Sequence, residues 1–187
     1  MIYNWKKIVR YGLPLLTLCI SVEIFAGQIL QDKQETLLAL PIFLISIPVI
    51  NGVGGNIGSV LGARLASGLH VGYIKLSLKD KEMHENVITS VLVGFITYGF
   101  LAILIYFIAL LGGIQMGDLG FMIKFIFVVL VAGLLLVCVV SLTSVFTAFL
   151  SFKKGLDPDD MVAPVVTTVG DTMGIIFLIV LIGVVIV

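Results

Sequence analysis

Five long apolar stretches, separated by short polar segments, dominate the pattern along the chain. They extend over residues 9–30, 37–69, 87–112, 121–152 and 163–187. A helix needs about 20 apolar residues to cross the hydrocarbon core of a bilayer, and each stretch is long enough. The pattern therefore predicts an all-α, multi-pass protein of the cell membrane, with five transmembrane helices.

The composition agrees with lipid as the solvent. Of 187 residues, 60% are hydrophobic and 12% are charged, whereas a soluble domain carries about 25% charged residues. The 11 basic and 11 acidic residues balance, so the chain has no electrostatic footprint for nucleic acid. Because the sequence contains no P-loop, dinucleotide fingerprint or hydrolase elbow, we expect neither an enzyme nor a cofactor-binding site.

The basic residues predict the orientation of the chain. Lysine and arginine collect in cytoplasmic loops, and most of them here flank one side of the predicted helices. That side holds Lys6, Lys7, Arg10, Lys75, Lys79, Lys81, Lys153 and Lys154, and the other side holds Lys33 and Lys124. We therefore expect a cytoplasmic amino terminus and an external carboxyl terminus.

A short pattern occurs twice, once in the second stretch and once in the fifth. The segment PVINGVGGNIG at 48–58 aligns with PVVTTVGDTMG at 164–174. The two segments have opposite predicted orientations, and a pair of helices interrupted by glycine and proline is a pointer to a transport site. We therefore predict that the second and fifth helices are broken by glycine and proline. A chance similarity between two segments rich in valine and glycine is the alternative.

The glycines of the second stretch have another interpretation. Gly54, Gly58 and Gly62 recur every four residues, and small residues at that spacing let helix backbones approach closely. The two interpretations are compatible, because a tightly packed helix can still present Asn51 or Asn56 to a channel.

Asp171 is a carboxylate well inside the fifth stretch. A buried charge of this kind usually faces an interior path or a partner. Thr167 lies one turn earlier on the same helix face, next to Thr168. Carboxylate, hydroxyl and carbonyl oxygens are hard donors that suit Mg²⁺, Ca²⁺ or Mn²⁺. A pairing of Asp171 with Arg64, or a helix cap, is the structural alternative.

Two further acidic features bear on the site. Glu23, near the middle of the first stretch, is a candidate second cation ligand, proton carrier or hydrogen-bonded partner of the second helix. The segment LDPDDMVAP at 156–164 reads as a helix start, with Asp157 as the N-cap and Pro158 as the first helical residue.

Two motifs together carry a family resemblance. P-x5-G-G-N at 48–56 and D-P-x5-P-x5-G-D at 157–171 resemble the transmembrane domain of MgtE magnesium transporters and their eukaryotic solute-carrier relatives. The resemblance covers residues 1–187 as one five-helix unit. It implies a homodimer with a cation pore at the interface, where paired aspartates hold a largely hydrated Mg²⁺.

The resemblance also implies roles for individual residues. Asp171 matches the central aspartate, with Thr167 and Asn56 as its helpers and Glu23 as a candidate accessory ligand. We expect the remaining small and polar residues of the two motifs to line the pore or to pack the helices, and these are Asn51, Gly54, Gly55, Gly58, Thr168 and Gly170.

The sequence also departs from the family. Bacterial members are gated by cytosolic amino-terminal and CBS domains, and we expect a single five-helix unit without them. Val60 occupies a commonly polar position, and Thr167 replaces a smaller residue. We expect a divalent cation transporter or channel, with Mg²⁺ as its ion. The alternatives are a proton- or sodium-coupled exchanger that uses Glu23, and a non-transporting membrane interaction protein.

Overall fold

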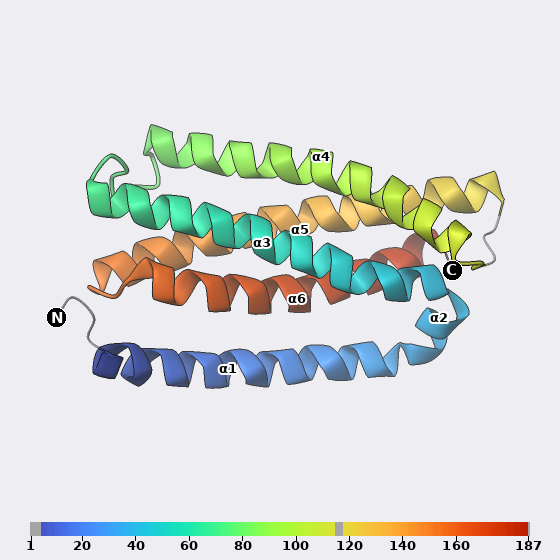
Figure 1. Ribbon diagram of the computed structural model, residues 1–187, viewed down its shortest axis with the longest axis horizontal. Helices are drawn as coiled ribbons and strands as arrows, with labels where there is room; N and C mark the ends of the chain where they lie inside the picture. The colour runs from blue at the N-terminus through green and yellow to red at the C-terminus, as the bar shows by residue number, and fades with distance from the viewer. Residues whose placement is uncertain (1–4, 115–117, 187) are drawn as a thin grey trace.

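A computed structural model describes residues 5–114 and 118–186, and every regular element in that part of the chain is a helix (Figure 1). Five of the helices are long and apolar enough to cross a membrane, which confirms the predicted membrane fold. The helices are α1 (Trp5–Asp32), α2 (Gln34–Ala39), α3 (Pro41–Val71), α4 (Lys81–Leu111), α5 (Leu119–Lys153) and α6 (Pro158–Val185).

The second predicted stretch, 37–69, contains two helices rather than one. The short helix α2 ends at Ala39, and α3 starts at Pro41. Proline disfavours a helical conformation in the residue before it, and Leu40 is accordingly non-helical, with φ −128° and ψ 69°. The fifth predicted stretch ends at Val187, which lies outside the described residues.

The three helices α3, α5 and α6 pack against one another and form the centre of the bundle. The helix α4 covers α3 and α5, whereas α1 packs along α6 and reaches α3 only through α2. In the described part of the chain, α1 and α3 lie on opposite sides of α6 without contacting each other (Figure 1). One long face of α6 is therefore left between them.

The predicted breaks in the second and fifth helices are absent. Both α3 and α6 are helical throughout, with Pro48 and Pro164 inside them. A membrane offers no water to freed backbone groups, which favours an unbroken helix. The glycines serve packing instead, since a side chain at Gly58 would collide with Val166 and Val140. The repeat thus produces close helix contact rather than an interruption.

Aspartates cap the starts of the last three long helices. Asp157 accepts a hydrogen bond from the backbone N–H of Asp159 at 3.1 Å, and Pro158 is the first residue of α6, which confirms the predicted helix start. Asp80 caps α4 by accepting from Met83 N–H at 3.0 Å. Asp118 caps α5 in the same way. These caps fix where each helix enters the bundle.

Candidate cation path

The two repeated segments lie side by side at the contact between α3 and α6. The side-chain amide of Asn51 donates to the backbone carbonyl of Asp171 at 3.1 Å. A Cβ atom at Gly170 would lie 3.5 Å from the backbone nitrogen of Gly55. The missing side chains therefore allow the two backbones to approach closely. This contact sets the level of Asp171 relative to α3.

One face of α3 remains uncovered along its whole length. Its members are spaced three or four residues apart, as one face of a helix requires. We call this row the α3 stripe: it consists of Pro41, Ile45, Pro48, Gly52, Asn56, Ser59, Ala63, Ser67 and His70. All are exposed except Ser59, which is half-buried. The half from Gly52 onward contains only small or polar side chains, whereas the half before it is apolar.

The helix α6 carries a matching row beside the α3 stripe. Asp160, Ala163 and Thr167 are exposed, and Asp171 is half-buried. Further along the same face, Leu178 is buried. At the level of the Asn51–Asp171 contact, the α3 stripe changes from small or polar to apolar side chains, and the α6 row changes from exposed small or polar to buried apolar ones. The small and polar members of the two rows, 52–70 of the α3 stripe and 160–171 of α6, together form what we call the polar strip. It starts at the α3–α4 loop, and Asp171 lies at its inner end.

The hydroxyl oxygen of Thr167 is available as a ligand for a cation. Its hydroxyl donates to the carbonyl oxygens of Ala163 at 2.9 Å and Pro164 at 3.1 Å. Because its proton is used within α6, the oxygen lone pairs are left to accept from water or to contact a cation. Thr167 and Asp171 thus present oxygen atoms one turn apart on the uncovered face of α6.

Glu23, on α1, adds a second carboxylate near Asp171. The hydroxyl of Thr168 donates to Glu23 Oε1 at 3.0 Å, and Glu23 lies within electrostatic range of Asp171. The hydrogen-bonded partner is therefore the fifth long helix, whereas one of the sequence interpretations placed it on the second. A single chain therefore brings two carboxylates, from α1 and α6, close together.

The remaining predicted residues divide by burial. Asn56 is exposed on the α3 stripe. The others lie between the helices and pack them: these are Asn51, Gly54, Gly55, Gly58, Thr168 and Gly170. The described residues contain no group of three acidic, histidine or cysteine ligands that could hold a metal ion. Asp171 and Arg64 form no ion pair among the described residues, where the salt bridge present joins Lys81 and Glu85.

Sequence reasoning missed most of the α3 stripe, including the three small or polar residues Ser59, Ala63 and Ser67. They follow Asn56 at intervals of three and four residues, so the signal was present as helical periodicity. To interpret that signal, one must know which face of α3 the neighbouring helices leave uncovered.

Comparison with known proteins gives a consistent result. A family model described as MgtE, divalent cation transporter, matches residues 47–181. Solute carrier family 41 member 3 of the mouse is 28% identical over 183 residues, which cover 90% of this chain and 36% of the relative.

Two other curated relatives agree. Solute carrier family 41 member 3 of the rat is 27% identical, with 90% of this chain and 38% of the relative covered. Member 2 of the mouse is 26% identical, with 86% and 29% covered. This chain thus spans between 29% and 38% of these relatives' length, and no solved structure matches it significantly. Because the family model covers most of the chain, this protein belongs to the MgtE family of divalent cation transporters.

Proposed function

We propose that this protein moves Mg²⁺ across the membrane along the polar strip between α3 and α6. The observation that carries the proposal is the position of Asp171 at the inner end of that strip. Small and polar side chains on an uncovered membrane helix face are poorly suited to lipid, and they suit a water-filled path. The lysine-rich ends of the helices are cytoplasmic in this proposal, so the strip opens toward the cytoplasm.

A second copy of the chain would cover the strip and complete the ion site. Asp171, Thr167 and Asn56 supply too few oxygen atoms for a divalent cation from one protomer. A two-fold axis along the strip doubles each of them, and such an interface is self-complementary. Mg²⁺ dehydrates reluctantly and usually keeps several waters. A few well-placed oxygens around a largely hydrated ion are therefore sufficient.

Flux into proteoliposomes tests the ion site. We expect Asp171→Ala to lower Mg²⁺ uptake by more than about tenfold, because the central carboxylate is lost. The matched control is Asp118→Asn, which removes a negative charge outside the strip and keeps an N-cap acceptor. Equal uptake by Asp171→Ala and the wild type would refute the assigned site. Absence of uptake by a well-folded wild type would favour a non-transporting interaction protein.

The contact between Glu23 and Thr168 supports one alternative, a proton- or sodium-coupled exchanger. A carboxylate hydrogen-bonded beside the ion site could release a proton or bind sodium as the cation moves. An exchanger requires uptake that follows a pH or sodium gradient and is lost in Glu23→Gln. Uptake that is indifferent to both gradients, and that survives Glu23→Gln, favours the uncoupled path.

A further inference from the structure

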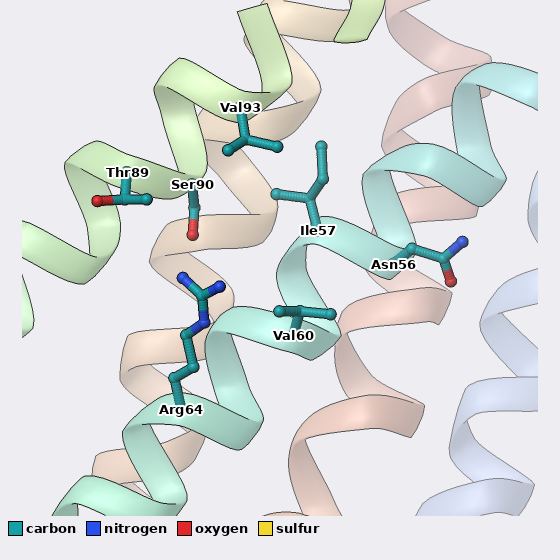
Figure 2. A pocket seen from close by; sticks show the side chains of 7 residues that line it. All are labelled: Asn56, Ile57, Val60, Arg64, Thr89, Ser90 and Val93. Carbon is teal, nitrogen blue, oxygen red and sulfur yellow. The ribbon is translucent and has the colours of Figure 1, made fainter.

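A cleft that shares only Asn56 with the α3 stripe lies between α3 and α4, on the flank of α3 away from α6 (Figure 2). Its volume is about 180 Å³, and seven residues line it: Asn56, Ile57, Val60, Arg64, Thr89, Ser90 and Val93. Figure 2 shows the guanidinium of Arg64 directed across the cleft toward Ser90, while Asn56 at the far edge points away. The cleft thus contains one cationic group between two membrane helices.

The charge of Arg64 has no carboxylate partner among the residues that the structure describes. A guanidinium does not lose its proton in proteins, and an unpaired charge inside a membrane span is costly. Arg64 lies about 10 Å before the end of α3 at Val71, at 1.5 Å per residue. An anion in the cleft would remove this cost.

The other polar groups of the cleft leave Arg64 as its principal donor. The hydroxyl of Thr89 donates to the carbonyl of Glu85 at 2.7 Å, and that of Ser90 donates to the carbonyl of Asn86 at 3.0 Å. Both hydroxyl protons are thus engaged within α4, whereas the guanidinium presents five donors in a planar fork. Such a fork matches the oxygens of a phosphate group.

The depth and the walls of the cleft favour a lipid as the source of that phosphate. The 31 residues of α3 extend over about 46 Å, so about 8 Å projects beyond each side of a 30 Å hydrocarbon core. Arg64 therefore lies near the boundary between hydrocarbon and headgroups. Ile57, Val60 and Val93 give the cleft apolar walls, and Ile96, further along α4, is exposed as a lipid-facing residue would be.

We propose that this cleft binds the phosphate of an anionic phospholipid from the leaflet at the α3–α4 loop. Arg64 holds the phosphate with two parallel hydrogen bonds, and an acyl chain lies along the apolar walls. The loop above the cleft carries Lys75 and Lys79, which add attraction for an anionic headgroup. This assignment does not rest on the proposed transport function.

Native mass spectrometry of the purified protein, titrated with phosphatidylglycerol or phosphatidylcholine, tests the site. We expect the wild type to retain phosphatidylglycerol preferentially, and Arg64→Gln to lower that retention by about tenfold. Arg64→Lys keeps the charge without the fork, so it should retain an intermediate amount and shows that the fold survives. The matched control is Arg10→Gln, which removes an exposed arginine on α1 near the same end of the bundle.

Several outcomes would overturn the proposal. Equal retention of phosphatidylglycerol by the wild type and Arg64→Gln would refute the site. An equal loss of retention in Arg10→Gln would show that the lipid is held by diffuse attraction between charges. Displacement of phosphatidylglycerol by millimolar inorganic phosphate would identify free phosphate as the ligand. Loss of a dimer in Arg64→Gln, with lipid retention unchanged, would assign the guanidinium to a carboxylate of a second copy.

Discussion

The two halves of the α3 stripe differ although they belong to one continuous helix. The members of the stripe from Gly52 to His70 are small or polar, and those from Pro41 to Pro48 are apolar. The change occurs beside Asp171, where Asn51 joins the two helices. In the proposed path, the first half suits water and the second does not. We therefore expect the barrier of the proposed path on the α2 side of Asp171 and its vestibule on the other side.

The largest effect is expected from making the polar half apolar. Ser59→Leu places a branched apolar side chain in the vestibule, so Mg²⁺ uptake into proteoliposomes should fall by more than about tenfold. The matched control is Ser21→Leu, because Ser21 is exposed on α1 and lies on the opposite side of that helix from Glu23. Unchanged uptake by Ser59→Leu, or equal loss in both variants, would contradict a path along the α3 stripe.

A second comparison separates the buried face of α3 from the exposed one. A Cβ atom at Gly58 would overlap Val166, whereas one at Gly52 would meet nothing within 4 Å. Overpacking of this kind costs about 1–3 kcal/mol, so Gly58→Ala should lower the free energy of unfolding by that amount. Gly52→Ala should leave it unchanged or slightly raised, since alanine favours the helix. Thermal unfolding in detergent measures both, and equal melting temperatures would disprove the packing role of Gly58.

The glycines also show what the sequence could and could not predict. Apolar length predicted five spans, and Asp157–Pro158 predicted the start of α6, because both signals are local. Whether a run of glycines breaks a helix or packs it depends on what faces it. Gly58 faces Val140 of α5, a contact between segments far apart in the chain, so the local pattern alone could not exclude the predicted break.

The candidate site was predictable to a similar extent. Asp171 was found because a carboxylate inside an apolar stretch is conspicuous on its own. The pairing of Glu23 with Thr168 was not found, because it depends on α1 packing against α6 rather than α3. The lipid cleft was missed for the same reason: Arg64 gains its surroundings only when α4 folds back along α3.

A smaller effect is expected from making the apolar half more polar. Ile45 is 38% exposed on the α3 stripe, and replacing it by serine lets water advance toward Asp171 from the α2 side. We expect Ile45→Ser to raise Mg²⁺ uptake by about two- to fivefold, as a lowered dewetting barrier would. Ile96→Ser, on the exposed face of α4, is the control and should have no effect. A fall in uptake specific to Ile45→Ser would show that the apolar half supports the fold and is no barrier.

The smallest effect concerns how the segments that flank the two ends of α3 are held. The α2 side has no side-chain cap at Lys33 or Leu40. At the other end, Asp80 accepts from the backbone N–H of Met83 at 3.0 Å and of Lys75 at 3.3 Å.

The hydrogen bond from Met83 N–H contributes most to holding the pKa of Asp80 below its ordinary value of 3.8. A lowered pKa means that this carboxylate fixes the loop fully above pH 3.8 and loses its hold as the pH falls through the folded value. Hydrogen exchange at the Met83 amide, corrected for its intrinsic rate, should therefore lose protection only under those acidic conditions. Asp80→Asn keeps an acceptor that does not titrate, so its protection should be independent of pH. The same acid-induced loss in Asp80→Asn would assign the effect to another group, and the α3–α4 loop would then not depend on the Asp80 carboxylate.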